Sequence, residues 1–241
     1  AIQIIESKCH PGAIYLLHAV SKTNTEILGQ VIDDLRAQGY TVHLGGNIGT
    51  PLFDRIADIR PDDFAVLELS SFQLHSMHCA PDVAIITNIS PNHLDVHPDF
   101  EDYVSAKCSI YRGQRPDGVL VLNARDAHTP RFAAEAPGSV RYFSSIGPVE
   151  NGVYCSDGVI YRAHGGKAEK LIDVSDIRIP GAHNVENYMA AFAATDGLVG
   201  QAACVQVARS FAGVPHRMER IRELNGITFI CLLYTSDAAD D

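Results

Sequence analysis

Short, nearly continuous apolar runs alternate with amphipathic segments along most of this chain. Each run predicts a buried strand, because a strand covered by helices on both faces carries apolar residues on both faces. The runs are Ala13–Leu17, Tyr40–Leu44, Phe64–Leu69, Val83–Ile89 and Gly118–Leu122. This alternation predicts an α/β domain with a doubly wound, mostly parallel sheet and helices on both of its faces.

Apolar residues three and four positions apart predict the helices that follow these strands. The pattern covers Asn24–Gln38, where Gly39 supplies a stop, and then Phe100–Tyr111, Val185–Val199 and Ala202–Phe211. These lengths are typical of helices that cover a sheet.

The pattern of apolar and polar residues changes between Ser139 and Ile179, where it predicts short strands in place of helices. Ser156-Asp157-Gly158 predicts a hairpin turn within it. We interpret this stretch as a small β excursion from the same domain. A last strand is expected at Gly226–Ile230, and residues 231–241 show no element pattern and resemble translated vector sequence.

Composition narrows the class of protein. The chain has 241 residues, of which 46% are hydrophobic and 20% charged, and this is ordinary globular usage. A net charge of -10 argues against a nucleic-acid or membrane partner. No apolar run approaches the roughly 18–20 residues that span a bilayer. The six scattered cysteines form no C-x-x-C pair and indicate reduced thiols, so we expect a cytoplasmic protein.

Polar residues gather where the predicted strands end, and a doubly wound sheet binds its ligands at that edge. Glu68 and His93 are candidates for one hard-cation site, most simply Mg²⁺ bridging nucleotide phosphates. From spacing alone, the more ordinary interpretation is that Glu68 is a carboxylate at the sheet edge and His93 a histidine in a loop. The ordinary interpretation of Lys107 is a solvent-facing lysine. The other polar residues expected near this edge are Asn47, Ser70 and Ser71.

Three further patterns are weak when each is taken alone. His75, His78 and Cys79 have a spacing that could suit zinc. The further ligand that a zinc site needs, at a defined spacing from such a cluster, is missing. Gly181-Ala-His183-Asn184-x-x-Asn187 begins a helix whose N–H groups and amides could hold a nucleotide, or could simply cap the helix. Arg217 follows a proline turn, where a guanidinium could clamp phosphate or be merely solvated.

Taken in order, these motifs resemble the Mur ligases. One block separates the matching members of the family from sister ligases and folylpolyglutamate synthase, which differ there. This block is Leu67-Glu68-Leu-Ser70-Ser71-Phe-Gln73-Leu. The resemblance extends from about Gly39 to Ile230 and is nearest to the members that join D-glutamate to UDP-N-acetylmuramoyl-L-alanine in peptidoglycan synthesis. It implies that residues 1–230 are the central ATP-binding domain and that residues 231–241 are a non-native tail.

The resemblance also implies a role for each position. Glu68 and His93 would bind Mg²⁺, and Lys107 would be carried as a carbamate whose negative charge helps to hold a second metal ion. The other positions would contact the ligands: Asn47, Ser70 and Ser71 the UDP-muramoyl substrate, Thr25, Asn184, Asn187 and Arg217 ATP, and His183 the second substrate or the phosphates.

The implied reaction activates the substrate carboxylate as an acyl phosphate, which the amine of D-glutamate then attacks. Such a reaction requires ATP, cations that offset charge at the transferred phosphoryl group, and a site that positions two anions together. We expect the complete enzyme to be a monomer, and the net charge predicts that it binds neither nucleic acid nor membrane.

The sequence departs from the family pattern at the phosphate-binding loop, which has the form G-T-x-G-K-[ST]. The matching segment, Ser21–Thr25, lacks the glycines and has Asn24 where the lysine belongs. The flanking UDP-binding and amino-acid-binding domains are also absent, so we expect this chain to be an inactive fragment. The alternatives are a sister ligase such as folylpolyglutamate synthase, a non-catalytic binding module, or a zinc hydrolase that uses His75, His78, His93 and His97.

Overall fold

The computed structural model describes residues 13–17, 40–46, 56–91, 97–211, 217–224 and 227–232, and for 13–17, 217–223 and 227–232 it describes the backbone alone. Nine strands form one sheet in the order β2-β3-β1-β4-β5-β6-β7-β8-β9. The strands from β2 to β7 run parallel, and β7, β8 and β9 are antiparallel. The sheet is composed of β1 (Ala13–Leu17), β2 (Val42–Gly46), β3 (Phe64–Leu69), β4 (Val83–Ile86), β5 (Val119–Asn123), β6 (Ser139–Ser144), β7 (Gly152–Ser156), β8 (Val159–His164) and β9 (Lys167–Asp173).

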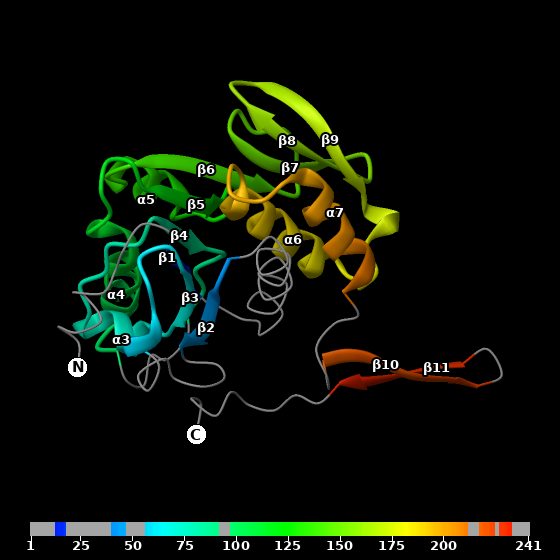
Figure 1. The fold of residues 1–241 in the computed structure, drawn as a ribbon, viewed down its shortest axis with the longest axis horizontal. Coiled ribbons are helices and arrows are strands. Elements are labelled where there is room, and N and C mark those ends of the chain that lie inside the picture. Colours follow the sequence, from blue (N-terminus) through cyan, green and yellow to red (C-terminus); the bar gives the residue numbers. More distant parts are fainter. Residues whose placement is uncertain are drawn as a thin grey trace.

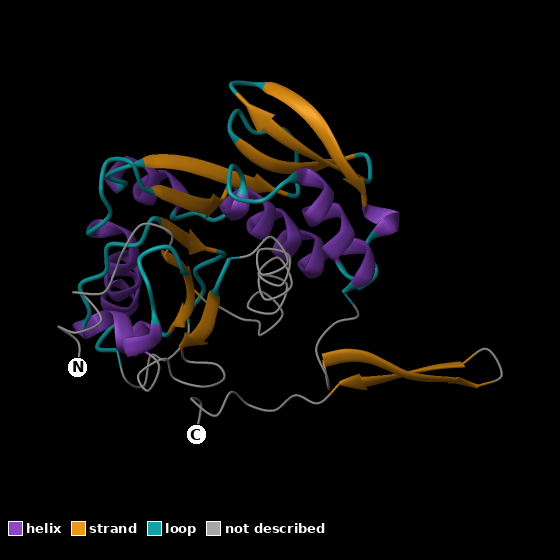
Figure 2. Ribbon diagram, in the orientation of Figure 1, coloured by secondary structure: helices purple, strands orange, loops and turns teal. Residues whose placement is uncertain are grey.

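Helices cover both faces of this sheet, and each face has its own apolar core (Figure 1, Figure 2). One core joins the sheet to α6 and α7, and the other joins it to α3, α4 and α5. The crossovers between parallel strands require this arrangement, because each helix must bury its apolar stripe against the sheet. The helices are α3 (Ser71–Ser76), α4 (Phe100–Arg112), α5 (Thr129–Glu135), α6 (Ala182–Thr195) and α7 (Gln201–Ser210).

The predicted α/β class and the β excursion are confirmed, with shifted boundaries. β4 ends at Ile86 and not at Ile89, because the Ile89 N–H donates to Asp126 Oδ2 at 2.5 Å and the chain leaves the sheet. The hairpin turn has positive φ angles at Asp157 (50°) and Gly158 (74°), as a two-residue turn requires. The predicted helix at residues 24–38 lies outside the described residues.

The chain ends its described part in a separate two-stranded sheet, formed by β10 (Arg217–Leu224) and β11 (Ile227–Leu232). Figure 1 shows this hairpin apart from the main sheet. Arg217, expected in a loop, is the first residue of β10 and pairs with Leu232. The last strand therefore continues two residues beyond its predicted end at Ile230.

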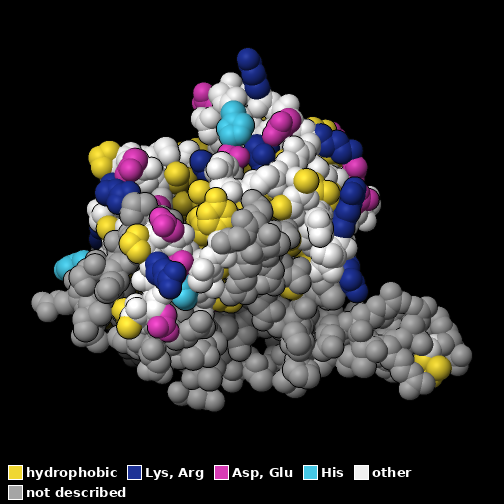
Figure 3. Space-filling view, in the orientation of Figure 1, with side chains coloured by type: hydrophobic (Ala, Val, Ile, Leu, Met, Phe, Trp, Pro, Cys, Tyr) yellow, Lys and Arg dark blue, Asp and Glu magenta, His cyan; other side chains and the backbone are white. Residues whose placement is uncertain are grey.

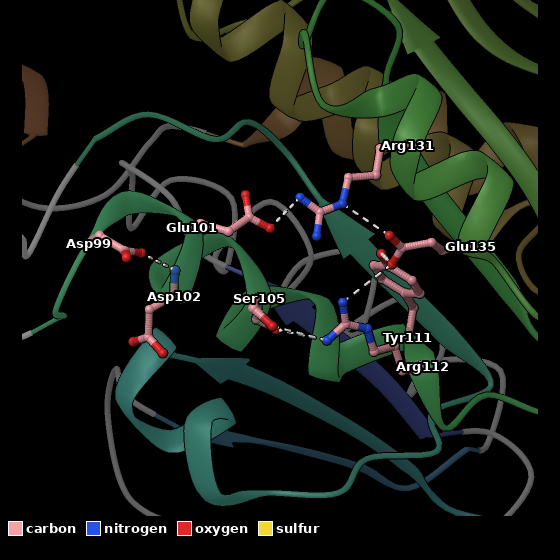
Figure 4. A network of polar contacts seen from close by, with 8 residues as sticks. All are labelled: Asp99, Glu101, Asp102, Ser105, Tyr111, Arg112, Arg131 and Glu135. Carbon is pink, nitrogen blue, oxygen red and sulfur yellow. Dashed lines mark hydrogen bonds and ion pairs between the residues drawn. The ribbon is translucent and has the colours of Figure 1, made fainter.

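Polar contacts between α4 and α5 hold these two helices together (Figure 4). Arg131 of α5 pairs with Glu101 and Glu135, and Arg112 of α4 reaches Glu135 at 3.4 Å. These ion pairs are largely solvated and contribute little individually. The hydroxyl of the buried Tyr111 donates to Glu135 Oε2 at 2.8 Å, and this bond is the one expected to matter for stability.

Two tyrosine-to-phenylalanine variants should therefore differ in stability. Tyr111→Phe should lower the free energy of unfolding by about 1–2 kcal/mol, because Glu135 loses a charge-assisted hydrogen bond. Among the described residues the hydroxyl of Tyr188 has no hydrogen-bond partner, so Tyr188→Phe should cause no loss or a small gain. Urea denaturation measures both, and equal losses would contradict the prediction.

A buried pair at the β2 edge gives the fold a pH dependence. His43 Nε2 and Asp63 Oδ2 are 3.0 Å apart, and the Arg60 N–H donates to the same carboxylate oxygen at 2.9 Å. Burial by itself raises the pKa of Asp63, but the hydrogen bonds from Arg60 and His43 outweigh it and the net pKa is lowered below 3.8. A lowered folded-state pKa stabilises the fold above the unfolded-state pKa, and that stabilisation is lost as the pH falls through the folded-state value.

Asp63→Asn should therefore cost about 1–3 kcal/mol of unfolding free energy at neutral pH. The gap between wild type and variant should narrow as the pH falls below about 4, because wild-type Asp63 then becomes protonated. Urea titrations at a series of pH values test this. A gap that stays constant down to acid pH would refute the assigned role of the carboxylate.

The described surface mixes charges of both signs. On the face shown in Figure 3, basic and acidic side chains are interspersed and no continuous basic stripe is visible. None of the helices in the described ranges combines the length and the hydrophobicity of a membrane span.

Candidate functional site

The candidate site is built on the carboxyl end of β3. Glu68 is the penultimate residue of this strand and is 0% exposed, and β3 lies between β2 and β1. Gly46, at the end of β2, is paired with Glu68, and a Cβ atom at Gly46 would lie 2.0 Å from the Glu68 carbonyl oxygen. The glycine thus permits the close strand approach that brings Glu68 to this edge.

Lys107 is buried and interacts electrostatically with Glu68, which corrects the solvent-facing interpretation. The side chain is on α4, 2% exposed, with Nζ 4.9 Å from the centre of the Tyr103 ring. Burial lowers the pKa of Lys107 to about 8, and the charge of Glu68 opposes part of that shift. The structure therefore brings together two of the predicted site residues as a buried pair of opposite charge.

Ser70 and Ser71 follow directly after β3. Ser70 is the N-cap of α3, where its hydroxyl accepts from the Gln73 N–H at 3.3 Å and the Gln73 side chain accepts from the Ser70 N–H at 2.8 Å. This capping box fixes the turn after Glu68. Ser71 is buried, and its Oγ lies 3.0 Å from His97 Nε2.

A second polar group lies at the start of α6, after Gly181 with φ 112°. Asn184 is 3% exposed, and its Nδ2 donates to the Pro180 carbonyl at 2.6 Å. Among the described residues, Asn184 Oδ1 and Asn187 Nδ2 have no hydrogen-bond partner. A buried acceptor and a buried donor that are both left unpaired lower the stability of the fold. The two amides therefore fit a ligand that supplies one hydrogen-bond donor and one acceptor. His183 is exposed at the same helix start.

The remaining predicted site residues are not tested by side-chain geometry. Thr25, Asn47 and His93 lie outside the described residues, and for Arg217 the backbone alone is described. The predicted sharing of one cation by Glu68 and His93 therefore stays a prediction. Within the described ranges, no group of three or more histidine, cysteine or acidic side chains could hold a metal ion, which disfavours zinc at His75, His78 and Cys79.

His97 is predicted from the sequence only as a ligand of an alternative zinc site, and its place beside Ser71 and Asp102 is missed. Its ring nitrogens contact Ser71 of α3 and Asp102 of α4, which are 26 and 5 residues away in sequence. These three side chains meet only in the folded chain, and no sequence motif predicts their contact.

A family model for the Mur ligase middle domain matches residues 15–195. The chain belongs to the Mur ligase family. A UDP-N-acetylmuramoylalanine--D-glutamate ligase of Acetivibrio thermocellus is 48% identical over 208 residues, covering 86% of this chain and 44% of the relative. A ligase of the same name from Clostridium kluyveri is 42% identical over 226 residues, covering 91% of the chain and 47% of the relative. This Mur ligase chain thus spans less than half the length of these relatives.

Solved structures share its fold. MurF from Acinetobacter baumannii superposes with a TM-score of 0.70 at 21% identity, covering 98% of this chain and 53% of that one. MurF from Thermotoga maritima, solved in complex with ADP, gives 0.65 at 18% identity, covering 98% and 56%. Escherichia coli FolC gives 0.61 at 16% identity, covering 92% and 62%. At these identities the likeness concerns the fold alone.

Proposed function

We propose that this Mur ligase chain is the nucleotide-binding part of an ATP-dependent ligase that adds D-glutamate to UDP-N-acetylmuramoyl-L-alanine in peptidoglycan synthesis. The observation that carries the proposal is the buried Glu68–Lys107 pair at the carboxyl edge of the sheet. The names of the relatives at 42–48% identity support the substrate class.

The residues present fit Mg²⁺ and a nucleotide. The Glu68 carboxylate is a hard oxygen ligand of the kind that Mg²⁺ takes through one or two carboxylates and phosphate oxygens. When bound, the ion would offset the charge of the phosphates. The unpaired Oδ1 of Asn184 and Nδ2 of Asn187 offer one acceptor and one donor, as the edge of a nucleobase requires.

The chain's own side chains would then divide the work. Glu68 would ligate the ion from the sheet edge. Lys107 is a cation in the unliganded chain, and as a carbamate it would instead carry negative charge toward a second metal ion. Ser70, fixed by its capping box, would meet the muramoyl substrate from the same turn. The carbamate expected at Lys107 and the second metal ion remain part of the proposal.

Ligand protection tests the proposed function on the chain itself. A ligand that binds only the folded state raises the unfolding midpoint in proportion to RT ln(1 + [L]/Kd). Mg·ADP and UDP-N-acetylmuramoyl-L-alanine should each raise the midpoint, whereas a folate should not. Protection by the folate would favour the sister ligase. No nucleotide protection, even of a longer chain that carries the flanking domains, would favour the non-catalytic binding module.

The amide pair on α6 gives a sharper test of the nucleotide site. Asn187→Leu should weaken Mg·ADP binding about tenfold, because a ligand group loses a hydrogen bond worth about 1–2 kcal/mol. Asn151→Ala is the matched control, since among the described residues the Asn151 side chain accepts a hydrogen bond from the Gly165 N–H, in the turn between β8 and β9 and away from α6. Calorimetric titration measures both, and equal affinities for the two variants would remove Asn187 from the site.

A further inference from the structure

His97 joins two helices through a chain of polar contacts. Its Nδ1 lies 2.7 Å from Asp102 Oδ2, and its Nε2 lies 3.0 Å from Ser71 Oγ. Asp102 Oδ1 is also 3.3 Å from Nε2 of His75. His97 is 4% exposed and Ser71 is 1% exposed, so the bond between them is shielded from water, whereas the side chain of Asp102 is 31% exposed.

The direction of these bonds follows from Asp102. The hydrogen bond from His97 lowers the pKa of Asp102, so the carboxylate acts as an acceptor. In the neutral ring Nδ1 then carries the proton, and Nε2 accepts from the Ser71 hydroxyl. In that tautomer His97 donates to Asp102 of α4 and accepts from Ser71 of α3, so one ring links the two helices.

The order serine, histidine, aspartate resembles a hydrolytic triad, but the burial of Ser71 argues for another role. A nucleophile must be presented to its substrate, and a hydroxyl that is 1% exposed and bonded to His97 is not. The arrangement instead fits a tie between the start of α3 and the first turn of α4.

This tie lies between Glu68 and Lys107, the two buried residues of the candidate site. Ser71 begins α3 three residues after Glu68, and the edge of the His97 ring meets the Tyr103 ring at 5.4 Å between centroids. The Tyr103 ring in turn lies 4.9 Å from Lys107 Nζ. His97 thus touches both the turn that follows Glu68 and the ring that contacts Lys107.

We propose that His97 is a positioning residue for the Glu68–Lys107 pair, because its two hydrogen bonds hold α4 in register with the end of β3. The functional meaning of this tie rests on the proposed ligase site. The tie itself is a property of the folded chain and can be measured without any ligand.

The experiment reads the position of Lys107 by NMR at one fixed pH. The methylene protons next to Nζ should be shifted upfield by the Tyr103 ring current. His97→Phe keeps a ring but loses both hydrogen bonds, and His97→Gln loses the ring but keeps a polar group directed at Ser71. If the hydrogen bonds position Lys107, His97→Phe should lose most of the upfield shift and His97→Gln should retain more of it. The opposite order would show that ring packing alone is responsible and would overturn the proposal.

His128→Phe is the matched control. His128 also bonds an aspartate, with Nδ1 3.1 Å from Asp126 Oδ1, and also packs between aromatic rings, but it does not contact Ser71 or Tyr103. It should lose stability as His97→Phe does while leaving the Lys107 signal unchanged. An equal change in both variants would also overturn the proposal.

Ser71→Ala covers the case in which His97→Phe does not fold. It removes one bond of the tie and should shift the Lys107 signal in the same direction by a smaller amount. An unchanged signal would overturn the proposal. If these variants shift the Lys107 signal but no nucleotide protects the chain, the tie is upheld and the ligase site is refuted. Failure of the positioning proposal and failure of the proposed function are therefore distinguishable.

Discussion

Gly46→Ala should lower the free energy of unfolding by about 3–5 kcal/mol, the sum of a strained backbone and a clash. Gly46 has φ 129°, a conformation that residues with a Cβ rarely adopt, and its added methyl would lie 2.0 Å from the Glu68 carbonyl oxygen and 2.8 Å from the Glu68 nitrogen. The obstacle is backbone, so no rotamer change relieves it. Urea denaturation measures the loss.

Gly147→Ala is the control for this prediction. Gly147 has a similar φ of 143°, but a Cβ added there would have no neighbour within 4 Å. It should cost only the strain, about 1–2 kcal/mol. Equal losses for the two variants would mean that β2 and β3 do not approach as closely at Glu68 as their register requires.

Lys107→Met should cost about 3–5 kcal/mol, because it removes the cation beside a buried carboxylate. The double variant Glu68→Gln with Lys107→Met should be less destabilised than the sum of the two single variants, since neither buried charge then remains. Denaturation of all four proteins in the cycle gives the coupling energy between the two side chains.

Lys170→Met is the matched control for Lys107. Lys170 is exposed and pairs with Asp173 at 2.6 Å on the surface of β9, so its loss should change stability by less than about 1 kcal/mol. Strictly additive effects in the Glu68 and Lys107 cycle would contradict the account, because they would mean that the two buried groups do not interact.

The sequence predicted the sheet well because buried parallel strands carry an unbroken apolar signal. The elements it missed are short or begin with a cap and not with a periodic face. α3 has six residues, and its one local sign is the serine-to-glutamine capping box from Ser70 to Gln73. α5 has seven residues and begins with proline in its first turn, a start signal without enough length to show a period.

The site was only partly predictable, for physical reasons that differ between residues. Glu68 could be predicted because it lies at the carboxyl end of a buried strand, next to its last residue. Lys107 is predicted at the site by the family resemblance, whereas the local pattern alone favours a solvent-facing side chain. Tyr103, four residues before it, belongs to the apolar face of the same helix, and that spacing predicts a shared face. His97 could not be predicted, since its partner Ser71 is 26 residues away and meets it only after α3 and α4 pack together.

A crystal structure of the chain with ADP, and with Mn²⁺ in place of Mg²⁺, would locate the metal through its anomalous signal. We expect an ion within about 2.5 Å of the Glu68 carboxylate, reached also by His93 and close to Lys107, with the nucleotide base at Asn184 and Asn187. An ion bound at any other place, or a Glu68 that contacts no metal at saturating Mn²⁺ and ADP, would contradict this expectation.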